Sequence, residues 1–169
     1  MNPNVFAQAM IRELRTLKRE VEAYPDEASL WHKTPELPNS AGNLVLHLAG
    51  NIQHFVGAEL GRTGYTRDRA AEFSRTGVSK AELQQEIDKA ITAVDRAFAG
   101  QAAAQLGELF PSTFAGLTLT RGEALVHLTT HLAYHLGQVD YHRRLVARSG
   151  TAVGAIVPGE VRAQGHGSV

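Results

Sequence analysis

The sequence predicts an all-α protein with the architecture of a four-helix bundle. Four segments repeat apolar residues every three or four positions, as the buried face of an amphipathic helix does. These segments cover residues 5–24, 40–60, 79–98 and 120–148, with short or irregular links between them. The rest of the chain has no convincing strand pattern, although the alternation in 112–120 is compatible with a short strand or hairpin before the last helix. We therefore expect one bundle domain over residues 1–148.

The first predicted helix has a clear apolar stripe and a clear end. Its apolar positions are Val5, Met10, Leu14, Leu17 and Val21. Charges of both signs fill the opposite face, which indicates a solvated surface. Pro25 ends the helix, and residues 25–40 read as a rigid, irregular link in which Trp31 covers the core.

The second predicted helix begins at Ser40 or Asn43. Its core positions are Val45, Leu48, Ile52, Phe55 and Val56. His47, Asn51 and His54 form a polar stripe at the edge of that apolar face. The connection that follows, 61–77, is charged and rich in turn residues, so we expect an exposed loop whose arginines could meet an acidic substrate group.

The third predicted helix begins with a capping box formed by Ser79 and Glu82. Its core face carries Leu83, Ile87, Ile91, Val94 and Phe98. After the fourth helix, residues 149–169 are rich in glycine, which argues against regular structure. The apolar run 152–158 within this tail is expected to pack on the bundle or on a partner chain.

Composition excludes several classes of function. The chain of 169 residues has 17 basic and 17 acidic side chains, so no overall charge attracts nucleic acid or an anionic membrane. It contains no cysteine, which excludes disulfides, thiolate metal ligands and a cysteine nucleophile. Its first residues do not resemble a signal peptide, and no segment has the roughly 20 apolar residues of a spanning helix. We expect a cytoplasmic protein that acts on a small molecule.

The fourth predicted helix carries most of the candidate metal-binding histidines. Thr120 and Glu123 form a capping box at its start. At about 100° per residue, five polar side chains fall within one stripe of its surface: His127, His131, His135, Gln138 and His142. Burying such a stripe is unfavourable unless each polar group has a partner. Four residues apart, His131 and His135 can reach a single ion.

A histidine from the second helix would complete a set of three nitrogen ligands. Three protein ligands with an open position are typical of a catalytic zinc site. Both His47 and His54 are candidates for the third ligand. Leu132 follows His131 where an H-E-x-x-H metalloprotease has its general base, which argues against a protease of that class.

The two histidine-bearing segments resemble the signature helices of the DinB-like (YfiT-like) metal-binding bundle superfamily. They read NLVLHLAGNIQHFVGAEL over 43–60 and HLTTHLAYHLGQVDYHRRL over 127–145. The family motif has one histidine on the second helix and, on the fourth, two histidines four residues apart with Gly-Gln shortly after. The matching positions are His47, His131, His135 and Gly137–Gln138. Leu136 departs from the pattern, since many members have Arg there, so no role of that Arg carries over.

The resemblance implies a divalent metal, zinc or nickel, held by His47, His131 and His135, in a protein that forms a homodimer. It also implies a metal-dependent transferase or hydrolase for a small electrophile, which activates water or a low-molecular-weight thiol cosubstrate. Gln138, one turn after His135, is the candidate catalytic residue that orients a ligand or bound water. His127, Tyr134 and His142 are candidates for supporting roles. The alternative is a non-catalytic, dimeric, stress-related protein with a structural metal site.

Overall fold

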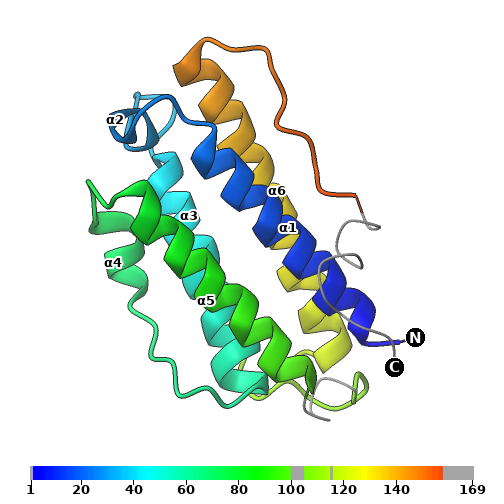
Figure 1. The fold of residues 1–169 in the computed structure, drawn as a ribbon. Coiled ribbons are helices and arrows are strands. Elements are labelled where there is room, and N and C mark those ends of the chain that lie inside the picture. The colour runs from blue at the N-terminus through cyan, green and yellow to red at the C-terminus, as the bar shows by residue number, and fades with distance from the viewer. Residues whose placement is uncertain (1, 100–104, 115, 158–169) are drawn as a thin grey trace.

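The computed structural model describes residues 2–99, 105–114 and 116–157. Its elements, in chain order, are α1 (Asn4–Glu22), α2 (Glu27–Leu30), α3 (Ala41–Ile52), the π-helix η1 (Gln53–Leu60), α4 (Arg69–Ser74), α5 (Lys80–Ala99) and α6 (Arg121–Ala147). Four long helical rods run side by side: α1, α3 continued by η1, α5 and α6 (Figure 1). The predicted all-α, four-helix bundle is confirmed.

The apolar stripes of the four rods meet in one core. Helices α5 and α6 each pack against both α1 and α3, so α1 and α3 stand diagonally opposite. Fully buried side chains from all four rods fill the centre, among them Met10, Leu14, Leu48, Ile52, Leu83, Ile87, Leu125, Leu128 and Leu132. Val5, predicted to be part of this core, is instead 46% exposed in the first turn of α1.

The helix starts follow from side-chain caps. Thr120 and Glu123 form the predicted capping box at the start of α6. Ser79 and Glu82 exchange the same pair of hydrogen bonds before α5. At α3, the Ser40 hydroxyl accepts from the Asn43 N–H at 3.1 Å, so Ser40 is the N-cap. Each cap satisfies an N–H group that the helix itself leaves without a partner.

Two of the connections contain more structure than the sequence predicts. Residues 25–40 include α2, and Trp31 at its end packs over Gly42, where an added Cβ would lie 2.6 Å from the indole ring. Residues 61–77, predicted to be an exposed loop, include α4, whose Glu72 is only 6% exposed. The prediction was wrong at α4 because the local charge pattern does not reveal that Glu72 finds buried partners.

The predicted hairpin before α6 reduces to two isolated bridges, Leu109 with Thr120 and Phe114 with Leu117. Positions 100–104 and 115 of this stretch lie outside the described residues. The ring of Phe114 stacks on that of Phe55 at 4.6 Å between centroids, so this turn closes the η1 end of the bundle.

The first part of the C-terminal tail lies along its own bundle. Residues 149–157 run back beside α6 and α1 (Figure 1). Ile156 is 6% exposed, and its N–H donates to the Thr16 hydroxyl at 3.1 Å. The remainder of the predicted tail, 158–169, lies outside the described residues. Among the helices described, none has the length and apolar character needed to cross a membrane.

Candidate metal centre

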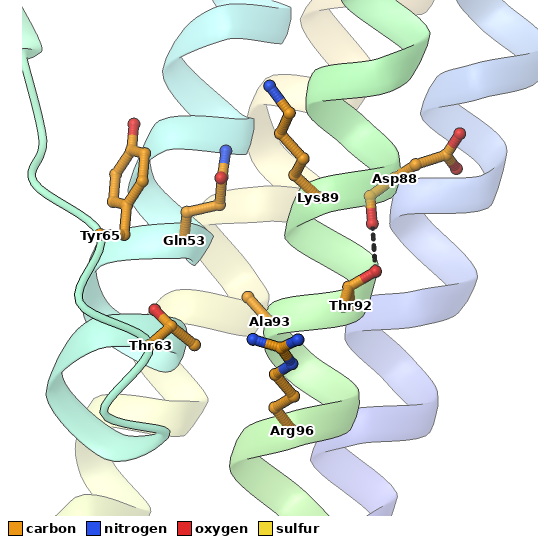
Figure 2. Close-up of a pocket in the computed structure, with 8 residues that line it drawn as sticks. All are labelled: Gln53, Thr63, Tyr65, Asp88, Lys89, Thr92, Ala93 and Arg96. Carbon is orange, nitrogen blue, oxygen red and sulfur yellow. Dashed lines mark hydrogen bonds between the residues drawn. The ribbon is translucent and has the colours of Figure 1, made fainter.

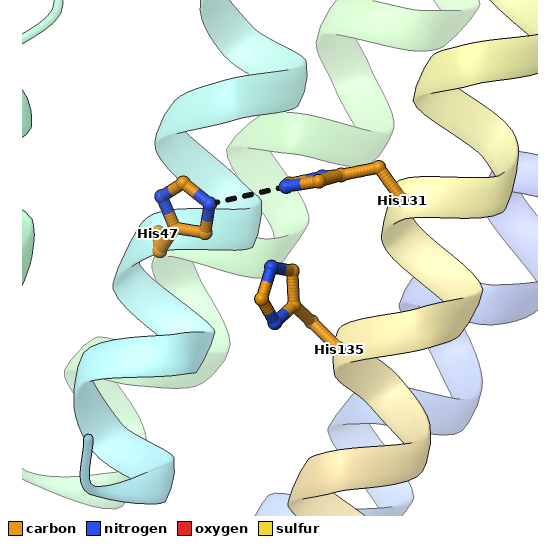
Figure 3. Close-up of side chains that lie close together, drawn as sticks. All are labelled: His47, His131 and His135. Atoms are coloured by element: carbon orange, nitrogen blue, oxygen red, sulfur yellow. Dashed lines mark hydrogen bonds between the residues drawn. The ribbon is translucent and has the colours of Figure 1, made fainter. Parts of the chain in front are cut away.

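Three histidines face one another between α3 and α6. His47 projects from α3 toward His131 and His135, which occupy successive turns of α6 (Figure 3). One ring nitrogen from each lies within 4.8 Å of the others, and Nε2 of His47 is 3.3 Å from Nε2 of His131. Two nitrogens bound to one tetrahedral zinc ion at about 2.0–2.1 Å lie about 3.3–3.4 Å apart. The spacing therefore suits a shared ion.

Helix packing brings this triad together. Leu132 and Leu136 of α6 are buried in the core, and they fix the rotation of the helix. His131 and His135, one position earlier on each turn, then lie at the edge of the core and are partly buried. His47 sits on α3, every residue of which is buried. The triad is thus mounted on two packed rods rather than on loops.

Burial keeps the imidazoles of His131 and His135 neutral. Burial lowers the pKa of His131 to about 4, and the nearby charges of His135, His47, His127 and Arg67 act in the same direction. Burial also lowers the pKa of His135, and this outweighs the opposing effect of its hydrogen bond to Gln138. Neutral imidazole is the form that binds metal. Nδ1 of His131 is buried and has no hydrogen-bond partner among the described residues.

Hydrogen bonds orient two of the three rings. Nδ1 of His135 lies 2.6 Å from Oε1 of Gln138, and Nδ1 of His47 lies 2.9 Å from Oε2 of Glu72. An acceptor oxygen beside Nδ1 favours the tautomer with its proton on Nδ1, although Nδ1 of His47 also lies 3.2 Å from Nη2 of Arg67. Nε2 of each ring is then unprotonated and free to bind an ion. A three-histidine donor set with two oriented tautomers fits a divalent metal such as zinc.

The triad opens into a pocket of about 720 Å³. Besides the three histidines, the pocket is lined by Asn39, Asn51, Phe55, Arg67, Arg69, Phe73 and His127. The ring of Phe73 lies 5.0 Å from that of His47, and the Arg69 guanidinium lies 5.3 Å from the centre of the Phe73 ring. The pocket therefore combines aromatic walls with a cation near its mouth.

The other candidate residues are distributed differently. His127 is exposed at the pocket, with its ring 6.0 Å from that of His131. His54, the rival of His47, is outside the triad, and its nearest charged partner is Glu59 at 3.9 Å. Each π-helical turn takes more residues than an α-helical turn, so the spacing from His47 is altered beyond Ile52.

His142 and Tyr134 also lie apart from the triad. His142 is buried, with Nδ1 at 2.8 Å from the Tyr24 hydroxyl and Nε2 donating to the His32 carbonyl at 2.9 Å. It therefore ties α6 to the connection between α1 and α2 and to the residue that follows the C-cap of α2. Tyr134 is 65% exposed, and its ring lies 5.2 Å from that of His135.

Sequence reasoning missed Arg67 and Glu72. Nε and Nη2 of Arg67 donate to the Glu72 carboxylate at 2.6 and 2.8 Å, directly behind His47. A partial signal existed, since Asp68 followed by Arg-Ala-Ala-Glu is typical of a capped helix start. No local signal indicates that this short helix docks against α3.

A second hollow of about 410 Å³ lies between η1, the connection that follows it and α5 (Figure 2). It is lined by Gln53, Thr63, Tyr65, Asp88, Lys89, Thr92, Ala93 and Arg96. It shares no lining residue with the histidine pocket. The Thr92 hydroxyl donates to the Asp88 carbonyl at 2.9 Å, which satisfies it within α5.

Fold and site together define a helical-bundle protein with three convergent histidines beside a pocket. Residues 9–139 match the DinB superfamily model, which covers most of the bundle. The chain belongs to the DinB superfamily. Comparison with curated proteins and with solved structures found no match.

Proposed function

We propose that this protein binds a divalent metal ion, zinc or nickel, through His47, His131 and His135. The observation that carries the proposal is the convergence of three ring nitrogens within 4.8 Å beside an open pocket. Three neutral nitrogen ligands leave a coordination position available, which is the pattern of catalytic zinc sites. A bound ion would supply Lewis-acid chemistry, lowering the pKa of a water or thiol that enters the pocket.

We further propose a small electrophile as substrate, attacked by water or by a low-molecular-weight thiol in a hydrolysis or transfer reaction. The size of the pocket, about 720 Å³, supports a small molecule. Arg69 is exposed at the pocket, where its guanidinium is suited to an acidic group of the substrate or thiol. Asn51 lines the same pocket and can hydrogen-bond to a bound molecule.

Gln138 supports the site through His135 in this proposal. Its amide oxygen accepts from Nδ1 of His135 at 2.6 Å, and Gln138 is not among the residues that line the histidine pocket. Gln138 would thus orient a metal ligand rather than touch the substrate. Loss of this hydrogen bond would leave the His135 ring free to change tautomer.

A homodimer and a cytoplasmic location remain part of the proposal. Three large apolar side chains on one stretch of α6, Tyr134, Tyr141 and Leu145, are 62–73% exposed. Exposed apolar residues at this density favour a partner surface. Sedimentation at tens of micromolar tests the dimer, and a monomer alone would contradict it.

An activity assay separates the catalytic proposal from the alternative of a structural metal site. Metal-loaded protein is incubated with a bacterial thiol and a model electrophile, and consumption of the thiol is followed. We expect turnover by the wild type and none by His131→Ala. Tight metal binding with no turnover for any thiol would instead support the non-catalytic alternative.

A further inference from the structure

Glu72 is a buried carboxylate that touches a proposed metal ligand. It lies on α4, is 6% exposed, and places Oε2 of its carboxylate 2.9 Å from Nδ1 of His47. Because the carboxylate forms an ion pair with Arg67, its oxygens are suited to accept the N–H of the ring.

Arg67 holds this carboxylate in place. Nε of Arg67 donates to Oε1 of Glu72 at 2.6 Å, and Nη2 donates to Oε2 at 2.8 Å. Nη2 also lies 3.2 Å from Nδ1 of His47, but its contact with Glu72 is the shorter one. A two-point contact between guanidinium and carboxylate fixes both groups in one plane. The Arg67 side chain is only 11% exposed, so its charge is compensated mainly by Glu72. The ion pair with Arg67 thus holds the Glu72 carboxylate in one orientation, as a fixed hydrogen-bond acceptor.

The backbone around the site makes room for Glu72. At Gly50 of α3, an added Cβ would lie 2.3 Å from Oε1 of Glu72, so only glycine permits the carboxylate to lie there. The Asn43 amide donates to the carbonyls of Glu72 and Arg75 at 3.0 and 2.9 Å, which docks α4 against α3. Asn43 and Gly50, both on α3, thus help to position the Glu72 side chain.

We propose that Glu72, held by Arg67, is a positioning residue that fixes His47 with its proton on Nδ1 and its unprotonated Nε2 toward the other two histidines. The role in metal binding rests on the proposed function, whereas the tautomer of His47 is a property of the metal-free protein. A carboxylate behind a histidine ligand fixes the ring and strengthens it as a donor, and its loss typically weakens metal affinity about 10–100-fold.

The first test is the protonation of His47 in metal-free protein. Long-range proton–nitrogen NMR at pH 7.5 distinguishes protonated from unprotonated ring nitrogens, and the His47→Gln spectrum assigns the signals. We expect His47 to carry its proton on Nδ1 in the wild type. In Glu72→Ala the acceptor is gone, and we expect a mixture of both tautomers. A wild-type ring protonated on Nε2 would overturn the proposal.

The second test is zinc affinity, measured by competition with a chromophoric chelator. We expect Glu72→Ala to bind zinc about 10–100-fold more weakly than the wild type. Glu72→Gln keeps a neutral hydrogen-bond acceptor, so we expect it to lose less zinc affinity than Glu72→Ala. Glu59→Ala is the matched control, because Glu59 faces His54 at 3.9 Å, outside the triad, and we expect its affinity to be unchanged. Equal affinities for the wild type and Glu72→Ala would overturn the proposal.

A third variant keeps the carboxylate but displaces it. Gly50→Ala should reproduce the tautomer mixture and the weaker zinc binding of Glu72→Ala, while Gly150→Ala, with no atom within 4 Å of its added Cβ, should not. A Gly50→Ala protein with unchanged affinity and tautomer would also contradict the proposal. If the wild type bound no zinc, the proposed function would fail, and the NMR measurement would still decide whether Glu72 sets the His47 tautomer.

Discussion

Three imidazoles at the edge of an apolar core can bind a metal ion only in their neutral form. Burial and mutual repulsion accomplish this for His131, whose pKa falls to about 4. The hydrogen-bond acceptors behind His47 and His135 then decide which nitrogen faces the pocket. At the scale of single residues, the proposed site consists of three histidines plus the oxygens that orient two of them.

His142 gives a pH prediction away from the triad. Burial lowers its pKa below the value of about 6.5 in the unfolded chain, despite the hydrogen bond to the His32 carbonyl. The unfolded state therefore binds more protons below about pH 6.5, so this part of the stability is present above that pH and lost as the pH falls. Urea unfolding of the metal-free protein at pH 7.5 and 5.5 measures the free energy of unfolding at each pH. Between these two values, we expect His142→Gln to lose less of this free energy than the wild type. An equal loss would contradict this.

At the scale of elements, α3 and α6 are rigid supports because their ends are capped and their apolar faces are buried. Thr120 and Glu123 satisfy the first N–H groups of α6, the helix that carries His131 and His135. We expect Thr120→Ala to lower the free energy of unfolding by about 1 kcal/mol. Chemical unfolding measures this, with the exposed Thr130→Ala as a control, and no difference between the two variants would contradict it.

The elements differ in how far the sequence predicts them. The helix that bears His131 and His135 can be predicted from its capping box and its repeated histidines, because both are local sequence patterns. The contact of Glu72 with His47 joins residues 25 apart in the chain through the docking of the short helix α4, and no local pattern indicates it. The π-helical continuation of α3 is likewise invisible, since apolar spacing alone does not distinguish it from an α-helix.

At the scale of the whole molecule, a buried ion pair joins α1, α6 and the tail. Nε of Arg143 donates to Glu20 at 2.5 Å, and Nη2 donates to the Thr151 carbonyl at 3.1 Å. Removing one partner leaves a buried charge without compensation, which costs about 3–5 kcal/mol. We expect Arg143→Met to lower stability by this amount and to expose residues 149–157 to proteolysis. A variant as stable as the wild type would contradict this.

Removal of the metal should lower the thermal stability of the protein without unfolding it. The core side chains of α1, α3, α5 and α6 pack without any ion, whereas the triad links only α3 and α6. A chelator should therefore lower the melting temperature, because a ligand bound to the native state stabilises it by linkage, while the helical circular dichroism at 25 °C stays nearly unchanged. Complete loss of helix on chelation would show that the bundle depends on the ion.

The metal content of protein purified without a histidine tag tests the central claim most directly. Elemental analysis of the wild type and of His131→Ala compares the intact triad with one that lacks a central ligand. We expect stoichiometric zinc or nickel in the wild type, and none retained by His131→Ala despite its unchanged helical circular dichroism. Stoichiometric metal in His131→Ala, or a wild type that retains none even after reloading, would contradict a metal centre at His47, His131 and His135.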